Sequence, residues 1–251
     1  MEFVYPCAGA GLSVVLPAYN EEENLEAAVA HCLDRLPRVT ELPFEVVVVN
    51  DGSRDRTGEL LDRLAAAHPQ VRRVHHACNQ GYGQAVLTGI RNTRYDLIFF
   101  TDADLQFDLG EIGLLFPHLQ DHDLVVGYRL NRQDPPHRLL FAYGWNKLMR
   151  LLFGLRIRDV DCAFKLFRRR VMENLTIISR GAMTSAEIMV RTRAAGVTFA
   201  QVGVHHYPRR RGTPTGGQLW VIARAFRELA RFFWIWYLAG PRIPVRESGR
   251  I

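Results

Sequence analysis

Apolar runs and amphipathic stretches alternate along the first hundred residues. The run at 44–49 is an uninterrupted, largely β-branched series, which is typical of a strand buried on both faces of a parallel sheet. With three similar runs, it predicts strands at about 13–17, 44–49, 71–76 and 96–100. Apolar residues at helical spacing predict intervening helices at about 25–36, 57–67 and 83–92. Successive strand–helix units predict a doubly wound α/β sheet.

The second half of the chain shows the same patterns less regularly. They predict strands at 124–127, 164–167 and 198–204, and helices at about 109–119, 139–153, 185–195 and 218–238. A length of 251 residues fits one large α/β domain with a short appendage. We therefore expect one domain over residues 1–217, followed by a segment, 218–251, that is built around an amphipathic helix.

Polar residues and glycines gather where the predicted strands end. Asp51 follows the second strand, and a turn with two glycines spans 79–83. Asp102 and Asp104 follow the fourth strand. Ligands on such sheets bind at the carboxyl ends of the strands. We therefore expect these groups to converge on one site.

The sequence Asp102-Ala103-Asp104 is the sharpest chemical signal in the chain. Two carboxylates that flank one residue can hold a hard cation such as Mg²⁺ or Mn²⁺ through oxygen ligands. Two solvated aspartates in a turn are the alternative interpretation of so short a motif. The buried strand before the motif, Asp51 after an earlier strand and Gln106 just beyond favour the metal site.

Several motifs in a fixed order resemble those of family-2 glycosyltransferases. They are residues 15–21, residues 51–53 with Asp55 and Thr57, Asn79 with Gly81 and Gly83, and residues 102–106. A narrower resemblance is to the branch that transfers hexoses to polyprenyl phosphates such as dolichol phosphate. It rests on Gly127, Arg129, 161–169, 209–212 and 213–216. The resemblance covers about residues 12–218. It implies a glycosyltransferase A-type, Rossmann-like fold, which is a mixed sheet flanked by helices.

The resemblance also implies a nucleotide-sugar pocket and a metal centre. The residues that it assigns to the pocket are Pro17, Tyr19, Glu21, Asp51, Gly81, Gly83 and Asp102. Asp51 would face the base, and the two glycines would let the backbone come close. Mg²⁺ or Mn²⁺ is assigned to Asp102, Asp104 and Gln106. Such a cation would neutralise the charge that develops on the departing nucleoside diphosphate.

The acceptor implied by the resemblance is a polyprenyl phosphate, whose phosphate oxygen is the nucleophile. A phosphate monoester has a second pKa near ~6, so it needs positioning more than it needs a base. Guanidinium groups suit this task, and motif position points to Arg129, Arg138, Arg209 and Arg211. The implied reaction is inverting hexose transfer, with candidate catalytic residues Asp104, Arg129, Arg209, Arg211 and Glu187. Glu187 is either a base or a structural, arginine-pairing carboxylate.

The net charge of +6 is concentrated near the C-terminus. Residues 205–251 hold nine arginines and two glutamates, whereas residues 1–204 hold 23 basic and 24 acidic side chains. This asymmetry favours a local anionic partner over a nucleic acid. The predicted helix at 218–238 is interrupted by arginines and rich in tryptophan, which is typical of an interfacial helix and not of a membrane-spanning one. We therefore expect a peripheral, monotopic protein whose C-terminal helix contacts a membrane surface.

The N-terminus and the cysteines indicate the compartment. Residues 1–11 lack the basic start and long apolar stretch of a signal peptide. The four cysteines form neither a CxxC pair nor a disulfide framework. We therefore expect the protein on the cytoplasmic face of a membrane.

Three alternative functions differ from this expectation. A sugar-1-phosphate nucleotidyltransferase would carry a glycine-rich motif near its first strand, and residues 16–20 do not resemble one. A catalytically silent binding protein would have lost one of the two aspartates at 102 and 104, and both are present. A glycosyltransferase acting on a soluble, glycan or protein acceptor stays open. The donor is equally open among GDP-mannose, UDP-glucose and UDP-N-acetylglucosamine.

Overall fold

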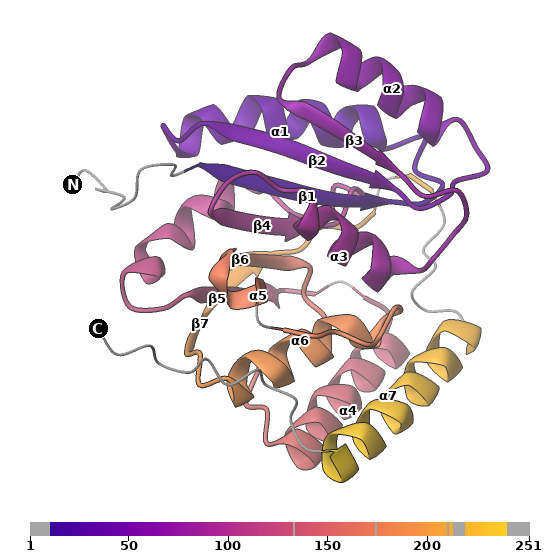
Figure 1. Cartoon of the computed structure of the whole chain (residues 1–251), viewed down its shortest axis with the longest axis vertical. Helices are drawn as coiled ribbons and strands as arrows, with labels where there is room; N and C mark the ends of the chain where they lie inside the picture. Colours follow the sequence, from indigo (N-terminus) through magenta and orange to yellow (C-terminus); the bar gives the residue numbers. More distant parts are fainter. Residues whose placement is uncertain (1–10, 133, 174, 210, 213–218, 240–251) are drawn as a thin grey trace.

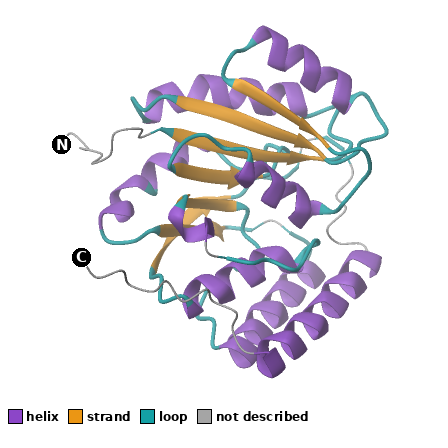
Figure 2. Cartoon of the chain, viewed as in Figure 1, coloured by secondary structure: helices purple, strands orange, loops and turns teal. Residues whose placement is uncertain are grey.

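A seven-stranded sheet with helices on both sides forms the body of the protein (Figures 1 and 2). The computed structural model describes residues 11–132, 134–173, 175–209, 211–212 and 219–239. The strand order is β3-β2-β1-β4-β6-β5-β7. This arrangement confirms the expected α/β fold, a mixed sheet flanked by helices.

The first half of the chain builds its part of the sheet from strand–helix units. Its elements are β1 (Leu12–Ala18), α1 (Leu25–Val39), β2 (Phe44–Asn50), α2 (Thr57–Ala67), β3 (Val71–His75), α3 (Tyr82–Arg91) and β4 (Leu97–Thr101). The pairs β1–β2, β2–β3 and β1–β4 are parallel. The chain moves outward from β1 to β3 and then returns to place β4 on the other side of β1. The direction of winding therefore reverses between β1 and β4, which is where ligands bind on such sheets.

The second half adds three strands and the remaining helices. Its elements are η1 (Leu109–Leu114), η2 (Phe116–Gln120), β5 (Leu124–Leu130), α4 (Pro136–Phe153), β6 (Phe164–Arg168), α5 (Arg170–Glu173), α6 (Met183–Ala194), β7 (Phe199–His205) and α7 (Leu219–Ala239). Strand β6 is antiparallel to both β4 and β5, whereas β5 and β7 are parallel. All other strands therefore end at one edge of the sheet, and β6 begins there.

Burial explains the apolar pattern of the central strands. Val46, Val47, Val48 and Val49 of β2 are all fully buried, as expected for a strand covered on both faces. Strand β4 is buried along its whole length. The ring of its Phe99 packs edge-on against Phe164 of β6, with 4.6 Å between ring centroids. This packing holds the antiparallel strand in the middle of the sheet.

One predicted helix is wrong. The stretch at 109–119 forms two separate 3₁₀ segments, η1 and η2, instead of one α-helix. Pro117 cannot donate a helical hydrogen bond, and Gly110 and Gly113 weaken a helix because they lose more conformational freedom than other residues. The other predicted strands and helices are present, with ends shifted by a few residues.

Helices α4, α6 and α7 form a group below the sheet in Figure 1. One side of α7 is buried through Ala225, Leu229 and Phe232. The guanidinium of Arg191, on α6, lies 5.3 Å from the centroid of the Phe232 ring. The C-terminal helix is therefore packed on the rest of the fold.

The described helices include none that combines the length and the apolar character needed to cross a bilayer. The tail of the expected C-terminal segment, 240–251, and the motif at 213–216 lie outside the described residues.

Candidate active site

The side chains expected at the strand ends lie at one edge of the sheet. Asp51 directly follows β2, and Asp102 directly follows β4. Strand β1 runs between them and ends at Ala18, so the segment with Glu21 begins at the same edge. Because β6 is antiparallel, the turn at 159–163 that leads into it also reaches this edge. The convergence predicted from strand ends is confirmed.

Asp102 and Asp104 are two neighbouring carboxylates, and the charge of Asp104 affects the ionisation of Asp102. Burial, together with the negative charge of Asp104, raises the pKa of Asp102 to about 7. The Tyr82 hydroxyl and the positive charge of Arg129 act in the opposite direction. Burial also raises the pKa of Asp104, against the opposing effects of the Gln106 amide and Arg209. Two neighbouring carboxylates whose ionisation is disfavoured by burial are suited to bind a cation, whose charge would compensate theirs.

The donor set at this pair fits a hard divalent cation. Oδ1 of Asp102 is buried without a hydrogen-bond partner among the described residues. Within the same residues, no group of three His, Cys, Asp or Glu side chains comes together as a metal site. The chain therefore offers a two-carboxylate site that oxygen atoms of a ligand would have to complete. The Gln106 amide nitrogen donates to the Tyr207 carbonyl at 2.9 Å, so only its amide oxygen is left for a metal.

Arg209 links two of the predicted site segments. Its Nη2 donates to both carboxylate oxygens of Glu21 at 2.7 Å, and its Nη1 lies 3.6 Å from Oδ2 of Asp104. The Nε atom donates to the backbone carbonyl of Arg211 at 2.7 Å, while the Arg211 residue is exposed. The arginine expected to bind an acceptor phosphate thus lies beside the expected metal ligand.

Asp51 anchors the turn at 79–83. Its Oδ1 accepts from the backbone N–H of Gln80 at 2.9 Å and lies 2.6 Å from Nδ1 of His76. Its Oδ2 accepts from the backbone N–H of Gly81 at 2.9 Å. Asp51 therefore shapes the loop beside the site, and a contact with a base stays a prediction. Pro17 is buried in β1 and Tyr19 is partly buried just beyond it.

Gly81 and Gly83 permit a close approach, but the neighbour is the start of α6. A Cβ atom on Gly83 would lie 1.7 Å from Oγ1 of Thr184. A Cβ atom on Gly81 would lie 2.7 Å from the backbone carbonyl of Arg180, and Gly81 has a φ of +103°, which L side chains rarely adopt. The glycines expected beside a nucleotide are thus required by packing between α3 and α6.

The other candidate acceptor arginines are already paired with carboxylates. Arg129 donates to Asp159 from Nε at 2.6 Å and from Nη2 at 2.8 Å, a bidentate arrangement. Burial opposes ionisation of Asp159, yet the hydrogen bond from Arg129 holds the pKa of this carboxyl below its usual range. Arg138 lies 3.2 Å from Asp134. A phosphate would have to share these arginines or displace their partners.

Glu187 is completely buried within the α6 region. Its carboxylate accepts from the backbone N–H groups of Ile178 and Ser179 and from Nε of Arg191, the last at 2.7 Å. These contacts are those of the structural, arginine-pairing alternative. They favour that interpretation over a role as catalytic base.

Several side chains at the site were not expected from the sequence. Tyr82 acts on Asp102, His76 pairs with Asp51, and Asp159 holds Arg129. A fourth, Lys165, is fully buried in β6 and donates to the Val160 carbonyl at 3.1 Å and to Ser185 Oγ at 2.9 Å. Asp159 and Lys165 lie within or beside a motif that the sequence displays, but Arg129 and Ser185 lie 30 and 20 residues away from them along the chain.

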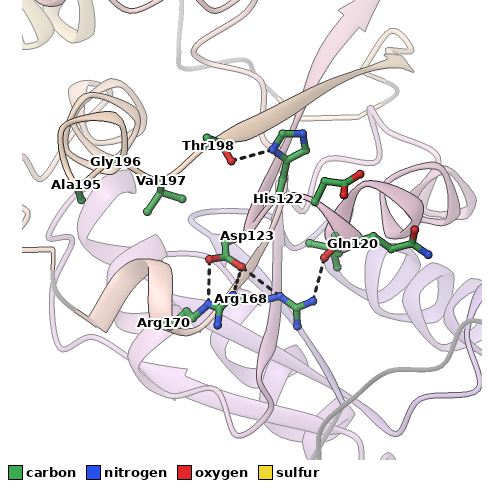
Figure 3. Close-up of a pocket in the computed structure, with 11 residues that line it drawn as sticks. Gln120, His122, Asp123, Arg168, Arg170, Ala195, Gly196, Val197 and Thr198 are labelled. Carbon is green, nitrogen blue, oxygen red and sulfur yellow. Dashed lines mark hydrogen bonds and ion pairs between the residues drawn. The ribbon is translucent and has the colours of Figure 1, made fainter. Parts of the chain in front are cut away.

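A polar hollow of about 350 Å³ lies at the opposite edge of the sheet (Figure 3). It is lined by the segments that precede β5 and β7, together with Arg168 and Arg170. Both arginines pair with Asp123, which compensates part of their charge. This hollow is separate from the carboxylate pair and does not belong to the candidate site.

Two of the three relatives described next are named as transferases that act on lipid phosphates. The chain is 32% identical over 205 residues to the undecaprenyl-phosphate 4-deoxy-4-formamido-L-arabinose transferase of Pectobacterium carotovorum subsp. carotovorum (strain PC1), covering 80% of this chain and 61% of the relative. It is 33% identical over 171 residues to the dolichyl-phosphate beta-glucosyltransferase ALG5C of Trichomonas vaginalis, covering 62% and 51%. The glycosyltransferase AglD of Haloferax volcanii is 32% identical over 213 residues, covering 80% and 34%. The chain thus spans less than two thirds of the length of these relatives.

Solved structures share the fold. Glucosyl-3-phosphoglycerate synthase from Mycobacterium tuberculosis, in complex with phosphoglyceric acid, superposes with a TM-score of 0.67 at 20% identity, covering 93% of this chain and 81% of the synthase. The same enzyme in complex with Mn²⁺, uridine diphosphate and glucosyl-3-phosphoglycerate gives a TM-score of 0.64 at 20% identity, with the same coverage. At this identity, the likeness supports the fold alone.

The family model for glycosyl transferase family 2 matches residues 13–176. This stretch runs from the second residue of β1 through β6 and includes Asp51, Asp102 and Asp104. The chain therefore belongs to glycosyl transferase family 2.

Proposed function

We propose that the protein transfers a hexose from a nucleotide-diphosphate sugar to a polyprenyl phosphate, with inversion at the anomeric carbon. The observation that carries this proposal is the Asp102–Asp104 pair. It follows β4, where the direction of winding reverses, and Arg209 lies 3.6 Å from Asp104. Family membership and the polyprenyl-phosphate transferases among the relatives support the acceptor class. The donor sugar is one of GDP-mannose, UDP-glucose and UDP-N-acetylglucosamine.

Asp102 and Asp104, with the amide oxygen of Gln106, would hold Mg²⁺ or Mn²⁺. The bound cation supplies charge neutralisation for the departing nucleoside diphosphate. Pro17, Tyr19, Glu21 and Asp51 border the proposed nucleotide-sugar pocket. The carboxylate pair does not need to remove a proton from the acceptor, because a phosphate monoester is already mostly ionised at neutral pH.

The arginines would position the acceptor phosphate. The charge of Arg129 acts on Asp102 and Arg209 lies beside Asp104, and each arginine is oriented by a carboxylate of its own, Asp159 and Glu21. Such pairing presets the direction of the guanidinium before a ligand arrives, which lowers the entropic cost of binding. Arg138 and Arg211 complete the proposed acceptor set.

We also propose that the protein works at the cytoplasmic face of a membrane as a peripheral protein. The C-terminal segment, 218–251, would make the contact through α7. Trp234 and Tyr237 of this helix are exposed, at 60% and 56%, and such rings are suited to the lipid headgroup region. A polyprenyl phosphate is itself held in a membrane, so this placement brings enzyme and acceptor together.

A donor panel tests the reaction directly. The full chain is incubated with each radiolabelled nucleotide sugar, Mg²⁺ or Mn²⁺, and a short-chain polyprenyl phosphate, and lipid-linked label is measured. We expect one donor to give product and a chelator to abolish it. Asp104→Ala should lower the rate by roughly 100-fold or more, the size of effect seen when one stabilising group of a transition state is removed.

Asp121→Ala is the matched control, because Asp121 is exposed and borders the hollow at the opposite edge of the sheet. This variant should keep the wild-type rate. Transfer to another acceptor, with none to polyprenyl phosphates, would instead support the soluble, glycan or protein alternative. Equal rates for Asp104→Ala and the wild type would contradict the proposed site.

A further inference from the structure

Helix α4 exposes large apolar side chains to solvent. Leu140, Tyr143 and Leu151 are 72%, 65% and 80% exposed. Of the thirteen large hydrophobic residues that are exposed in the described part of the chain, ten lie on α4 or α7. Apolar surface is thus concentrated on these two helices, and such concentration marks an interaction surface.

Helices α4 and α7 lie side by side and run in the same direction (Figure 1). Near their starts, the rings of Phe141 and Phe226 are 6.2 Å apart, and near their ends the rings of Phe153 and Phe233 are 6.4 Å apart. The Tyr237 hydroxyl donates to the Leu152 carbonyl. The two helices therefore form one packed unit.

Each helix carries one exposed stripe. On α4, Leu140, Lys147 and Leu151 are spaced by seven and four residues, which aligns them on one side of a helix with 3.6 residues per turn. On α7, spacings of three, four or seven residues align the exposed residues Trp220, Arg227, Arg231, Trp234 and Leu238.

The two stripes point to the same side of the helix pair. On α4, Phe141 faces α7 and comes one position after the stripe residue Leu140, a rotation of about 100°. On α7, Phe226 faces α4 and comes one position before the stripe residue Arg227. The two helices are parallel and both are right-handed. On α4 the stripe residue precedes the residue that faces the partner helix, and on α7 it follows that residue. Both stripes therefore lie on the same side of the helix pair. The buried residues Trp145, Met149, Ala225 and Phe232 lie on the side toward the core.

The outward face is cationic as well as apolar. Lys147, Arg150, Arg227 and Arg231 are exposed on it or at its border. The sequences of α4 and α7 contain a single acidic residue, Glu228. Its carboxylate accepts from Arg224 and from the backbone N–H of Gly181, so it is turned inward. Apolar and aromatic side chains with cations and no exposed carboxylate match the surface of an anionic bilayer.

We propose that α4 and α7 together form a single face that docks on an anionic lipid bilayer, with α4 as a membrane-contacting element in its own right. This inference rests on the proposed function and extends its membrane contact from the C-terminal segment to the middle of the chain. Arg138 lies in the first turn of α4, and Arg129 lies at the end of β5, just before it. Docking through α4 therefore places the proposed acceptor arginines at the end of the membrane face.

Vesicle binding of the full chain tests the proposal. Binding is measured by flotation with phosphatidylcholine vesicles that contain about a third phosphatidylglycerol, and with phosphatidylcholine alone. We expect the wild type to bind the anionic vesicles at least tenfold better. Leu140→Glu with Leu151→Glu should lower binding to anionic vesicles at least tenfold, while the melting temperature stays unchanged because both side chains are exposed.

Leu114→Glu is the control, because Leu114 is 51% exposed but lies on η1, away from the helix pair. It should bind vesicles as the wild type does. Wild-type binding by the α4 double variant would overturn the proposal, as would a wild-type dimer that this variant dissociates, since a second chain would then occupy the face. Vesicle binding needs no transfer activity. If no donor gave product in the donor panel, the vesicle result could therefore still be interpreted by itself.

Discussion

At the scale of single residues, carboxylate–arginine pairs decide which groups are available at the site. Glu187 and Arg191 pair with each other inside the α6 region, where both are buried. Arg129 and Arg209 are also paired, but they lie beside the Asp102–Asp104 carboxylates and are only partly buried. Motif position alone placed Glu187, Arg129 and Arg209 in one set of candidate catalytic residues. Their burial and their partners distinguish the enclosed Glu187–Arg191 pair from the two arginines beside the carboxylates.

Glu187→Gln is expected to lower stability and to spare turnover. Loss of the charge leaves Arg191 buried without its counterion, and breaking such a pair costs about 3–5 kcal/mol of the free energy of unfolding. Denaturant melts should show this loss, while the rate per folded molecule in the transfer assay stays within a few-fold of the wild type. A large fall in rate with unchanged stability would restore the role of catalytic base.

At the scale of secondary-structure elements, the junction of α3 and α6 lies beside the site, since Tyr82 at the start of α3 acts on Asp102. Gly83 and Thr184 are in such close contact that no side chain fits between the two helices. Gly81, at the N-cap of α3, is held by Asp51 at the end of β2. The hydrogen bond from Gly81 to Asp51 connects α3 to β2, and the close contact of Gly83 with Thr184 connects α3 to α6.

Gly83→Ala is expected to destabilise the protein by about 1–3 kcal/mol or more, because the added methyl group must push α3 and α6 apart. Gly144→Ala is the matched control within a helix, since a Cβ atom there meets nothing within 4 Å. The control should be neutral or more stable by about 0.5–1 kcal/mol, the helix preference of alanine over glycine. Thermal melts of both variants measure the difference. Equal melting temperatures would show that the contact yields without cost.

At the scale of the whole molecule, metal and nucleotide binding should be visible as stability. The pair Asp102 and Asp104 offers too few ligands to bind a cation tightly alone, so metal and nucleoside diphosphate are expected to bind together. The body around this site is near neutral, whereas cations gather at the C-terminal helices. The proposed donor binding and the proposed membrane docking would thus use separate surfaces of one fold.

Uridine or guanosine diphosphate with Mn²⁺ is expected to raise the melting temperature. At 100 times the dissociation constant, a ligand adds about 2.7 kcal/mol, which for a chain of this size corresponds to roughly 5–10 °C. Scanning fluorimetry measures the shift, which should largely vanish with a chelator or in Asp104→Ala and persist in Asp121→Ala. A shift of the same size without metal would contradict a shared site.

The sequence by itself determined most of the strands and helices along the chain, the strand-end positions of Asp51, Asp102 and Asp104, and the presence of a C-terminal helix. These features depend on periodicity and on neighbours in the chain, which local sequence displays. Only the tertiary structure decided that 109–119 is two short 3₁₀ segments, that the glycines at 81 and 83 serve packing against α6, and that Glu187 is enclosed. It also decided which arginine meets which carboxylate and that α4 and α7 share one outward face. Such contacts join residues far apart along the chain, and their energies depend on burial and orientation that no local pattern contains.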